Sequence, residues 1–231
     1  MTTTLITGGN KGLGRETARR LVAEGHDVWL GARDSERGQA TADELGARFL
    51  ALDVTSDESV QAAASVLESE VGHLDVLVNN AGIPGGWRSP ADTTADHVRA
   101  VYETNVFGLV RVTHAMLPLL QRSSRPVIVN VSSGMGSLTI TSDPDRIEST
   151  LLGLPYQSSK SAVNMITSQY ARSLPGIRIN AVDPGYTATD LNGHRGTQPV
   201  EVGAEVIVAM ALIGPDGPTG TYRDRTGPIP W

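Results

Sequence analysis

The stretch Thr-Gly-Gly-Asn-Lys-Gly-Leu-Gly-Arg-Glu, Thr7–Glu16, decides the fold expected for this chain. It follows a β-branched run, Thr2–Ile6, and leads into a stretch with helical spacing, Arg15–Ala23. A strand, a glycine-rich turn and a helix present backbone N–H groups and the positive end of a helix dipole to a phosphate. Glycine permits the tight turn and the close approach of the backbone to a pyrophosphate. An ordinary strand–helix turn is the alternative interpretation, so the rest of the chain has to discriminate between the two.

Composition excludes several classes of protein. The chain has 231 residues, enough for one α/β domain or two small ones, and its net charge of −6 is unlike that of a nucleic-acid-binding protein. It has no cysteine, which excludes disulfides, zinc–thiolate sites and thiol nucleophiles. No apolar run approaches the about 20 residues of a membrane span, no leader precedes the first strand, and the histidines lack metal-ligand spacing. We therefore expect a cytoplasmic protein without a metal and without a nucleic-acid or membrane partner.

Strand-like and helix-like segments alternate along the chain. The expected strands are Thr3–Thr7, Asp27–Ala32, Arg48–Leu52, Asp75–Asn79, Val127–Val131 and Arg178–Val182, with a last one around Gly220–Arg223. The expected helices are Arg15–Glu24, Ser35–Leu45, Asp57–Val71, Ala95–Gln121 and Gln157–Leu174, with Val206–Ile213 as the buried face of another and Ser35 and Asp57 as N-caps. This alternation predicts an α/β fold, a doubly wound parallel sheet with helices on both faces. No linker divides the chain, which predicts a single domain over residues 1–231.

The end of the second expected strand indicates which nicotinamide cofactor would fit such a sheet. In NAD-binding sheets an acidic residue at this position bonds the ribose 2′-hydroxyl. Here the strand ends Leu30-Gly31-Ala32-Arg33, with Asp34 one step further and Arg37 beyond it. Because guanidinium groups suit a 2′-phosphate, Arg33 favours NADP(H). Arg37, and Lys11 in the glycine turn, are further candidates, and a solvated surface position is the alternative for all three cations.

Tyr156 and Lys160 carry the expected chemistry, because a spacing of four on a helix puts both side chains on one face. A tyrosine hydroxyl has an unperturbed pKa near ~10, and we expect a nearby ammonium to lower that pKa and suit the residue to acid–base work. Ser133 follows the fifth expected strand, at the sheet edge where ligands bind in such folds, and its hydroxyl is expected to bond a carbonyl oxygen. A helix-surface pair and a simple turn are the alternatives.

These motifs form an ordered set: Thr7-Gly8-x3-Gly12-x-Gly14, Asp53, Asn79-Asn80-Ala81-Gly82, Asn105, Ser133, Tyr156-x3-Lys160 and Pro184-Gly185. Over nearly its whole length the chain resembles the short-chain dehydrogenases/reductases, and within them the NADPH-dependent carbonyl reductases. The resemblance implies a Rossmann-type fold and a catalytic set of Asn105, Ser133, Tyr156 and Lys160.

The resemblance also assigns the cofactor's contacts. It implies that Asp53 and Val54 contact the adenine, that Asn80 and Gly82 pack along the cofactor, and that Thr189 and the backbone near Thr187 hold the nicotinamide carboxamide. The full set expected to bind NADP(H) is Gly8, Asn10, Lys11, Gly12, Leu13, Gly14, Arg33, Arg37, Asp53, Val54, Asn80, Ala81, Gly82, Pro184, Gly185, Thr187 and Thr189.

The chain departs from the common family pattern between Ser133 and Tyr156, where the interval is longer. We expect the extra stretch, Leu138–Leu154, to form a surface loop or short helix over the substrate end of the cleft. In related reductases such an insertion is implied to obstruct dimer packing, so a monomer and a homodimer both stay open here. The segment Asp190–Pro199 is short for a substrate loop, which indicates an open pocket of broad specificity.

Together these expectations define one mechanism. A ketone or aldehyde oxygen accepts hydrogen bonds from Ser133 and Tyr156, hydride passes from NADPH to carbon, and Tyr156 gives its proton to the oxygen. Lys160 is expected to lower the pKa of Tyr156 and hold the nicotinamide ribose, and Asn105 to hold a water that resupplies the proton. An alcohol dehydrogenase or a 3-oxoacyl reductase is the enzymatic alternative, and an NADP(H)-binding sensor is the non-enzymatic one.

Overall fold

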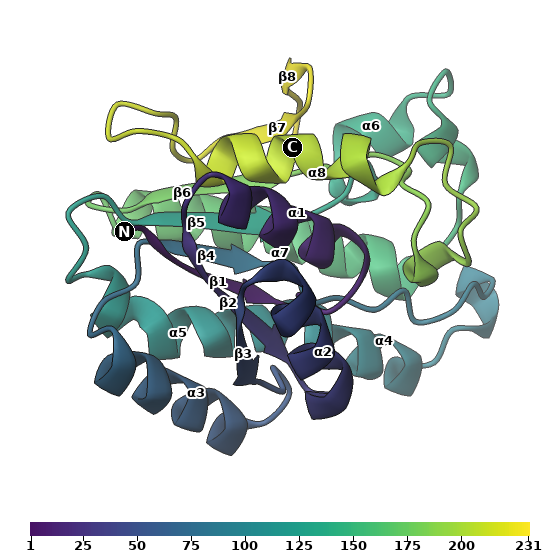
Figure 1. The fold of residues 1–231 in the computed structure, drawn as a ribbon. Helices are drawn as coiled ribbons and strands as arrows, with labels where there is room; N and C mark the ends of the chain where they lie inside the picture. The colour runs from purple at the N-terminus through teal and green to yellow at the C-terminus, as the bar shows by residue number, and fades with distance from the viewer.

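A computed structural model describes all residues 1–231 and arranges the chain around one eight-stranded sheet (Figure 1). The strand order is β3-β2-β1-β4-β5-β6-β7-β8, parallel from β3 to β7, with β8 antiparallel to β7. The bounds are β1 Thr3–Thr7, β2 Asp27–Ala32, β3 Arg48–Ala51, β4 Val76–Asn79, β5 Val127–Val131, β6 Arg178–Val182, β7 Tyr222–Asp224 and β8 Gly227–Pro228. The order reverses between β1 and β4, and this is the switch point at which ligands bind in open α/β sheets.

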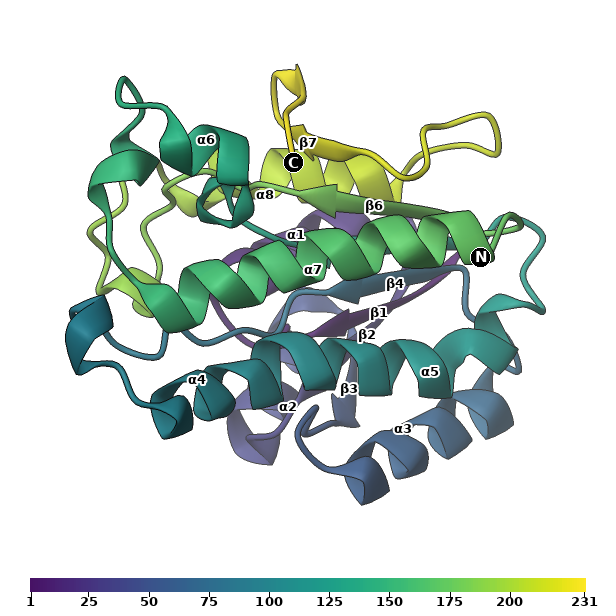
Figure 2. The same cartoon turned by 180° about the vertical axis from the view of Figure 1, so that it is seen from behind.

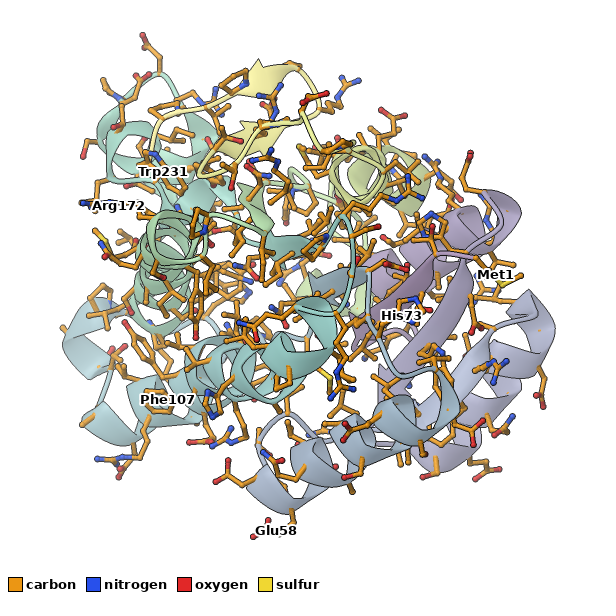
Figure 3. All side chains as sticks on the ribbon, turned by 90° about the vertical axis from the view of Figure 1, so that its left-hand side faces the viewer. Met1, Glu58, His73, Phe107, Arg172 and Trp231 are labelled. Atoms are coloured by element: carbon orange, nitrogen blue, oxygen red, sulfur yellow. The ribbon has the colours of Figure 1, made fainter.

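Helices cover both faces of the sheet, as predicted. One face carries α1 (Gly12–Ala23), α2 (Ser35–Leu45) and α8 (Val200–Ala211), which lie in front in Figure 1. The opposite face carries α3 (Asp57–Glu70), α4 (Ala95–Tyr102), α5 (Gly108–Leu120) and α7 (Leu154–Ser173), seen in Figure 2. Charged side chains project outward from this layer, such as Glu58 on α3 and Arg172 on α7 (Figure 3). None of the helices combines the length and apolarity that crossing a membrane requires.

Alternation along the central strands divides the apolar side chains between two cores. Leu5, Leu77 and Ile128 belong to the core that packs against α3 and α5, whereas Ile6 and Val78 belong to the core under α1 and α8. All five are fully buried. Each contributes roughly 1.5–3 kcal/mol relative to an exposed side chain, so the two cores hold the carboxyl ends of β1 and β4 side by side.

The two expected N-caps are wrong by one residue. The carboxylate of Asp34, not Ser35, caps α2 by accepting the Arg37 N–H at 3.1 Å. The hydroxyl of Ser56, not Asp57, caps α3 by accepting the Ser59 N–H at 3.1 Å. Both pairs of neighbours carry an oxygen acceptor, and the residue that stays extended before the first helical turn takes the position.

The stretch Ala95–Gln121 is not the uninterrupted helix that the sequence predicts. A π-helical turn, Glu103–Phe107, separates α4 from α5. Its residue Asn105 accepts the Ile83 N–H at 2.8 Å and donates to the Ile83 carbonyl at 3.0 Å and the Ser159 hydroxyl at 3.0 Å. These three bonds hold the Asn105 amide toward Ile83 and Ser159 within the π-helical turn.

Other boundaries differ by a few residues. Helix α7 begins at Leu154 rather than Gln157, because Pro155 is tolerated in a first turn. Helix α1 begins at Gly12, inside the glycine turn, rather than at Arg15. Strand β7 is displaced slightly from the expected Gly220–Arg223, and β8 was not predicted.

Candidate active site

A cleft of about 490 Å³ opens at the carboxyl edge of the sheet. Residues directly after the ends of β1, β2, β4, β5 and β6 line it. Of the residues expected to bind the cofactor or act on the substrate, all line this cleft except Gly14 and Asn105. Segments far apart in the chain therefore meet here, because parallel strands present their carboxyl ends at one edge.

The glycine turn is packed too tightly for a side chain at Gly14, which lies in the first turn of α1. A Cβ at Gly14 would lie 2.5 Å from the Gly8 carbonyl oxygen and 2.6 Å from the Asn80 Nδ2. That Nδ2 donates to the carbonyls of Thr7 at 2.9 Å and Gly8 at 3.1 Å. The absence of a side chain at Gly14 therefore allows the Gly8 carbonyl and the Asn80 amide to approach the start of α1. Asn80, which directly follows β4, fixes the turn through its two hydrogen bonds.

The N-terminus of α1 is left free to bind a ligand. Lys11 occupies the N-cap position without a side-chain cap, and the first turn carries no acidic residue. Helices α2 and α3, by contrast, are capped by Asp34 and Ser56. The uncapped N–H groups and the positive dipole end of α1 point at the cleft, which suits an anionic group such as a pyrophosphate.

The three expected cations differ in what surrounds them. Lys11 forms an exposed ion pair with Asp190, Nζ to Oδ2 at 3.1 Å, and Arg37 pairs with Asp34 at 3.4 Å. Arg33 is exposed at the cleft rim and makes no ion pair. Its nearby charge helps to lower the pKa of Asp53, secondary to the hydrogen bonds from Thr55. Arg33 is therefore the cation most available to a ligand phosphate.

Ser133, Tyr156 and Lys160 converge deeper in the cleft. Helix α7 places Tyr156 and Lys160 on one face, with the Lys160 Nζ 5.5 Å from the centre of the tyrosine ring. The Ser133 side chain lies within hydrogen-bonding reach of the tyrosine hydroxyl. The Lys160 ammonium donates to the Val131 carbonyl at 2.8 Å, which fixes it against the end of β5.

The expected lowering of the tyrosine pKa by Lys160 is wrong for this structure. Burial raises the pKa of Tyr156 to about 12, and the bond with Ser133 offsets only part of that rise. Burial also lowers the pKa of Lys160 to about 8. Removing water destabilises both phenolate and ammonium, and this loss of hydration is the largest effect on each pKa here. The tyrosine is therefore a neutral phenol at neutral pH, the form that donates a proton.

Comparisons with known proteins show the family to which the chain belongs. Residues 2–199 match the family model described as short chain dehydrogenase. The chain belongs to this family. It is 39% identical to a short-chain dehydrogenase of Penicillium roqueforti, covering 91% of this chain and 88% of the relative. It is 36% identical to carbonyl reductase (NADPH) 1 of Homo sapiens, covering 94% of each. The solved structure of salutaridine reductase from Papaver somniferum superimposes with a TM-score of 0.85 and 30% identity, over 96% of this chain and 99% of that one.

Membership makes this chain an oxidoreductase whose family binds a nicotinamide cofactor.

In this short-chain dehydrogenase the two neighbouring serines after β5 have different surroundings. The Ser132 hydroxyl is buried and donates to the Asn164 Oδ1 at 2.6 Å. The Ser133 hydroxyl faces Tyr156, so Ser133 is the one placed to meet a substrate.

Asn105 lies behind the cleft rather than in its wall. A Cβ placed on Gly82 would be 3.4 Å from the Asn105 Oδ1 and 3.7 Å from the Lys160 Nζ. The amide thus lies near the Lys160 ammonium, but it is already bonded to Ile83 and Ser159. In this arrangement the direct contacts of Asn105 connect the π-helical turn to the loop after β4.

The stretch between Ser133 and Tyr156 borders the cleft, as predicted. It contains a short helix, α6 (Leu138–Ser142), and a 3-10 turn, Ile147–Thr150. Ile147, Glu148 and Leu151 line the cleft, and Glu148 lies beside Gly134, the residue that follows Ser133. Trp87, Tyr186 and Leu191 also line the cleft.

Several of these wall residues carried no sequence signal. Trp87 and Tyr186 lie in irregular segments, and Asp183 directly follows a strand. For Asp183 a signal existed, because it stands at the carboxyl end of β6, where functional side chains gather in this fold.

Proposed function

We propose that this chain is an NADPH-dependent reductase of aldehyde and ketone carbonyls, acting in the cytoplasm and built as one cofactor-binding domain over residues 1–231. The observation that carries the proposal is the convergence of Ser133, Tyr156 and Lys160 in a cleft whose other end presents the unpaired guanidinium of Arg33. The relative of Homo sapiens that is named an NADPH carbonyl reductase supports the same assignment.

The residues present fit a dinucleotide phosphate. The uncapped start of α1 and the glycine turn would hold the pyrophosphate, and Asp53 and Val54 would border the adenine. Arg33 would pair with the 2′-phosphate. Asp34 is the competing signal for NAD, but its carboxylate already caps α2 and pairs with Arg37. The choice between the two cofactors therefore rests on Arg33.

The nicotinamide end would lie against the loop that follows β6. Pro184, Gly185, Thr187 and Thr189 line that part of the cleft. The Thr187 hydroxyl is held at 2.9 Å by the Gln198 amide, which keeps the loop folded back on itself. When bound, the cofactor supplies the hydride for the carbonyl carbon.

The chain's own residues would manage the proton. Ser133 donates a hydrogen bond to the substrate oxygen, and Tyr156 transfers its phenolic proton to the same atom. A pKa of about 12 keeps Tyr156 protonated until that transfer. Lys160, fixed on the Val131 carbonyl, presents its charge to the phenolate that forms. Asn105 would act beside Lys160 in resupplying the proton.

The test is turnover against a substrate panel. Oxidation of NADPH and of NADH is followed by absorbance with aldehydes, ketones, quinones and 3-oxoesters. Tyr156→Phe should keep NADPH binding and lose roughly 10²–10⁴-fold in turnover, the range of positioned acid–base catalysis. Ser132→Ala, the matched control, should be milder than Ser133→Ala because only Ser133 faces the tyrosine.

Three results would contradict the proposal. Near-normal turnover of Tyr156→Phe would remove the tyrosine from the mechanism. Tight NADPH binding with no turnover on any carbonyl would favour an NADP(H)-binding sensor instead. Activity confined to carrier-bound 3-oxoacyl groups or to alcohol oxidation would select one of the enzymatic alternatives.

A further inference from the structure

A buried asparagine on α7 contacts the segment that carries Ser133 without lining the cleft. Asn164 is only 4% exposed and lies outside the wall of the cleft. It stands one helical turn after Lys160 and two turns after Tyr156, so the three side chains follow one another along one face of α7. The mechanism above uses the first two of these residues and leaves Asn164 without a role.

The Asn164 amide forms two hydrogen bonds, one on each side of Ser133. Its Oδ1 accepts the Ser132 hydroxyl at 2.6 Å, and its Nδ2 donates to the Gly136 carbonyl at 3.2 Å. Both bonds are buried, where the low local dielectric strengthens them. One side chain of α7 therefore holds the chain directly before Ser133 and again at the end of the turn that follows it.

A continuous series of hydrogen bonds leads from Asn164 to the Ser133 hydroxyl. The Gly136 N–H donates to the Ser133 carbonyl at 2.7 Å and closes the 3-10 turn Gly134–Gly136. Inside that turn the Met135 N–H donates to the Ser133 Oγ at 3.3 Å. Because a hydroxyl has one hydrogen and two lone pairs, this contact leaves the Ser133 hydrogen free for a substrate oxygen. The orientation of the Ser133 hydroxyl thus depends on the turn that Asn164 holds.

Ser133 and Tyr156 come from different elements, so their separation depends on how the serine turn lies on α7. Tyr156 belongs to the helix, whereas Ser133 follows β5. Ser161 of the same helix donates to the Gly136 carbonyl at 2.9 Å and so contacts only the far end of the turn. Asn164 is the side chain of α7 that bonds the serine segment on both sides, which makes it the connection that aligns the two hydroxyls.

We propose that Asn164 is a positioning residue that sets the place of the Ser133 hydroxyl relative to Tyr156 during carbonyl reduction. The proposal rests on the reductase function above, in which both hydroxyls bond one substrate oxygen. Because turnover depends steeply on such alignment, loss of the two Asn164 bonds lowers kcat although Asn164 touches neither substrate nor cofactor. The affinity for NADPH stays unchanged, since Asn164 lies outside the wall of the cleft.

The test is a double-mutant cycle on kcat for carbonyl reduction with NADPH. Asn164→Leu keeps the branched shape of the side chain and removes both hydrogen bonds. It should lower kcat about tenfold, because a misplacement of about 1 Å costs roughly 10²-fold and the turn shifts by a fraction of that. In a Ser133→Ala background the same substitution should change kcat by less than about twofold, since the hydroxyl that Asn164 positions is gone. Asn164→Ala replaces the leucine variant if thermal melting shows that the latter does not fold.

Thr167→Val is the matched control. Thr167 is a fully buried residue in the next turn of α7, and its hydroxyl accepts the Asn130 amide of β5 at 2.9 Å. The substitution therefore also removes a buried hydrogen bond between α7 and β5, but one that does not involve the serine turn. The melting temperature should fall by several degrees, as for Asn164→Leu, whereas kcat should stay within about twofold of wild type. Lost stability alone then does not explain the lower kcat of Asn164→Leu.

The outcomes separate this proposal from the proposed function. A wild-type protein that reduces no carbonyl overturns both. With an active wild type, an unchanged kcat in Asn164→Leu overturns the role of Asn164 alone, and so does an equal fold-loss with and without the Ser133 hydroxyl. A loss of kcat in Thr167→Val as large as that in Asn164→Leu assigns Asn164 a purely structural role and also overturns the proposal.

Discussion

Gly136→Ala should damage catalysis through a single methyl group, because Gly136 is where the serine turn touches α7. Its carbonyl accepts the Ser161 hydroxyl at 2.9 Å and the Asn164 amide at 3.2 Å. The added Cβ would lie 2.7 Å from the Lys160 carbonyl carbon, 2.8 Å from the Lys160 Cβ and 2.9 Å from its carbonyl oxygen. These atoms belong to the helix itself, so no flexible side chain can move aside.

The magnitude follows from that geometry. Ordinary van der Waals contacts of a Cβ begin at 3.4 Å, so the turn and the helix must separate by at least about half an ångström. Overpacking of this kind costs about 1–3 kcal/mol in the free energy of unfolding. A misplacement of about 1 Å costs roughly 10²-fold in rate, so a half-ångström shift of Ser133 relative to Tyr156 should lower kcat by about tenfold or more.

The assay compares kcat and melting temperature with those of Gly176→Ala. Gly176 has no neighbour within 4 Å of its missing Cβ and no left-handed backbone angle. Its alanine variant should therefore stay within about 0.5 kcal/mol of wild type, with unchanged kcat. For Gly136→Ala the melting temperature should fall by about 2–4 °C per kcal/mol lost. Wild-type kcat and stability in Gly136→Ala would refute the packing of the serine turn on α7.

Three further predictions address the cofactor, the insertion and the stability. Arg33→Asp should lose a charge-assisted bond of ~1.5–3 kcal/mol, which should weaken the binding of NADPH about ten- to a hundredfold in a fluorescence titration while the affinity for NADH changes little. A wild-type protein that binds NADH more tightly than NADPH would contradict this prediction. Replacing Asp143–Ser149 with a short Gly/Ser linker should change KM and the ranking of substrates and should leave the affinity for NADPH unchanged. Sedimentation of the variant should show whether the protein moves from monomer towards dimer. Unchanged kinetics and an unchanged mass would make the segment an inert surface loop. Hydrogen bonds from Arg19 and Arg20 lower the pKa of Glu16, so its stabilisation is present above about pH 4.5, the unfolded value, and is lost as pH falls through the lower folded value. The unfolding free energies of wild type and Glu16→Gln should therefore differ more at pH 6 than at pH 3, and a constant difference would argue against the linkage.

The site could be predicted from the sequence where its residues follow from local pattern. The glycine turn, Tyr156 and Lys160 all stand at strand ends or on one helix face, positions that periodicity reveals. Because parallel strands end at one edge, those segments had to meet once the sheet was predicted. The environment of each side chain did not follow, as the raised pKa of Tyr156 shows.

The sequence by itself determined the alternation of apolar strands and amphipathic helices, and hence the doubly wound sheet and the edge where its motifs gather. These properties depend on side chains a few residues apart. Only the tertiary structure decided that Lys11 pairs with Asp190, that Asp34 is used as a cap and that Asp183 lies buried in the wall of the cleft. Burial and long-range pairing depend on which distant segments exclude water from a group, and no local pattern encodes that.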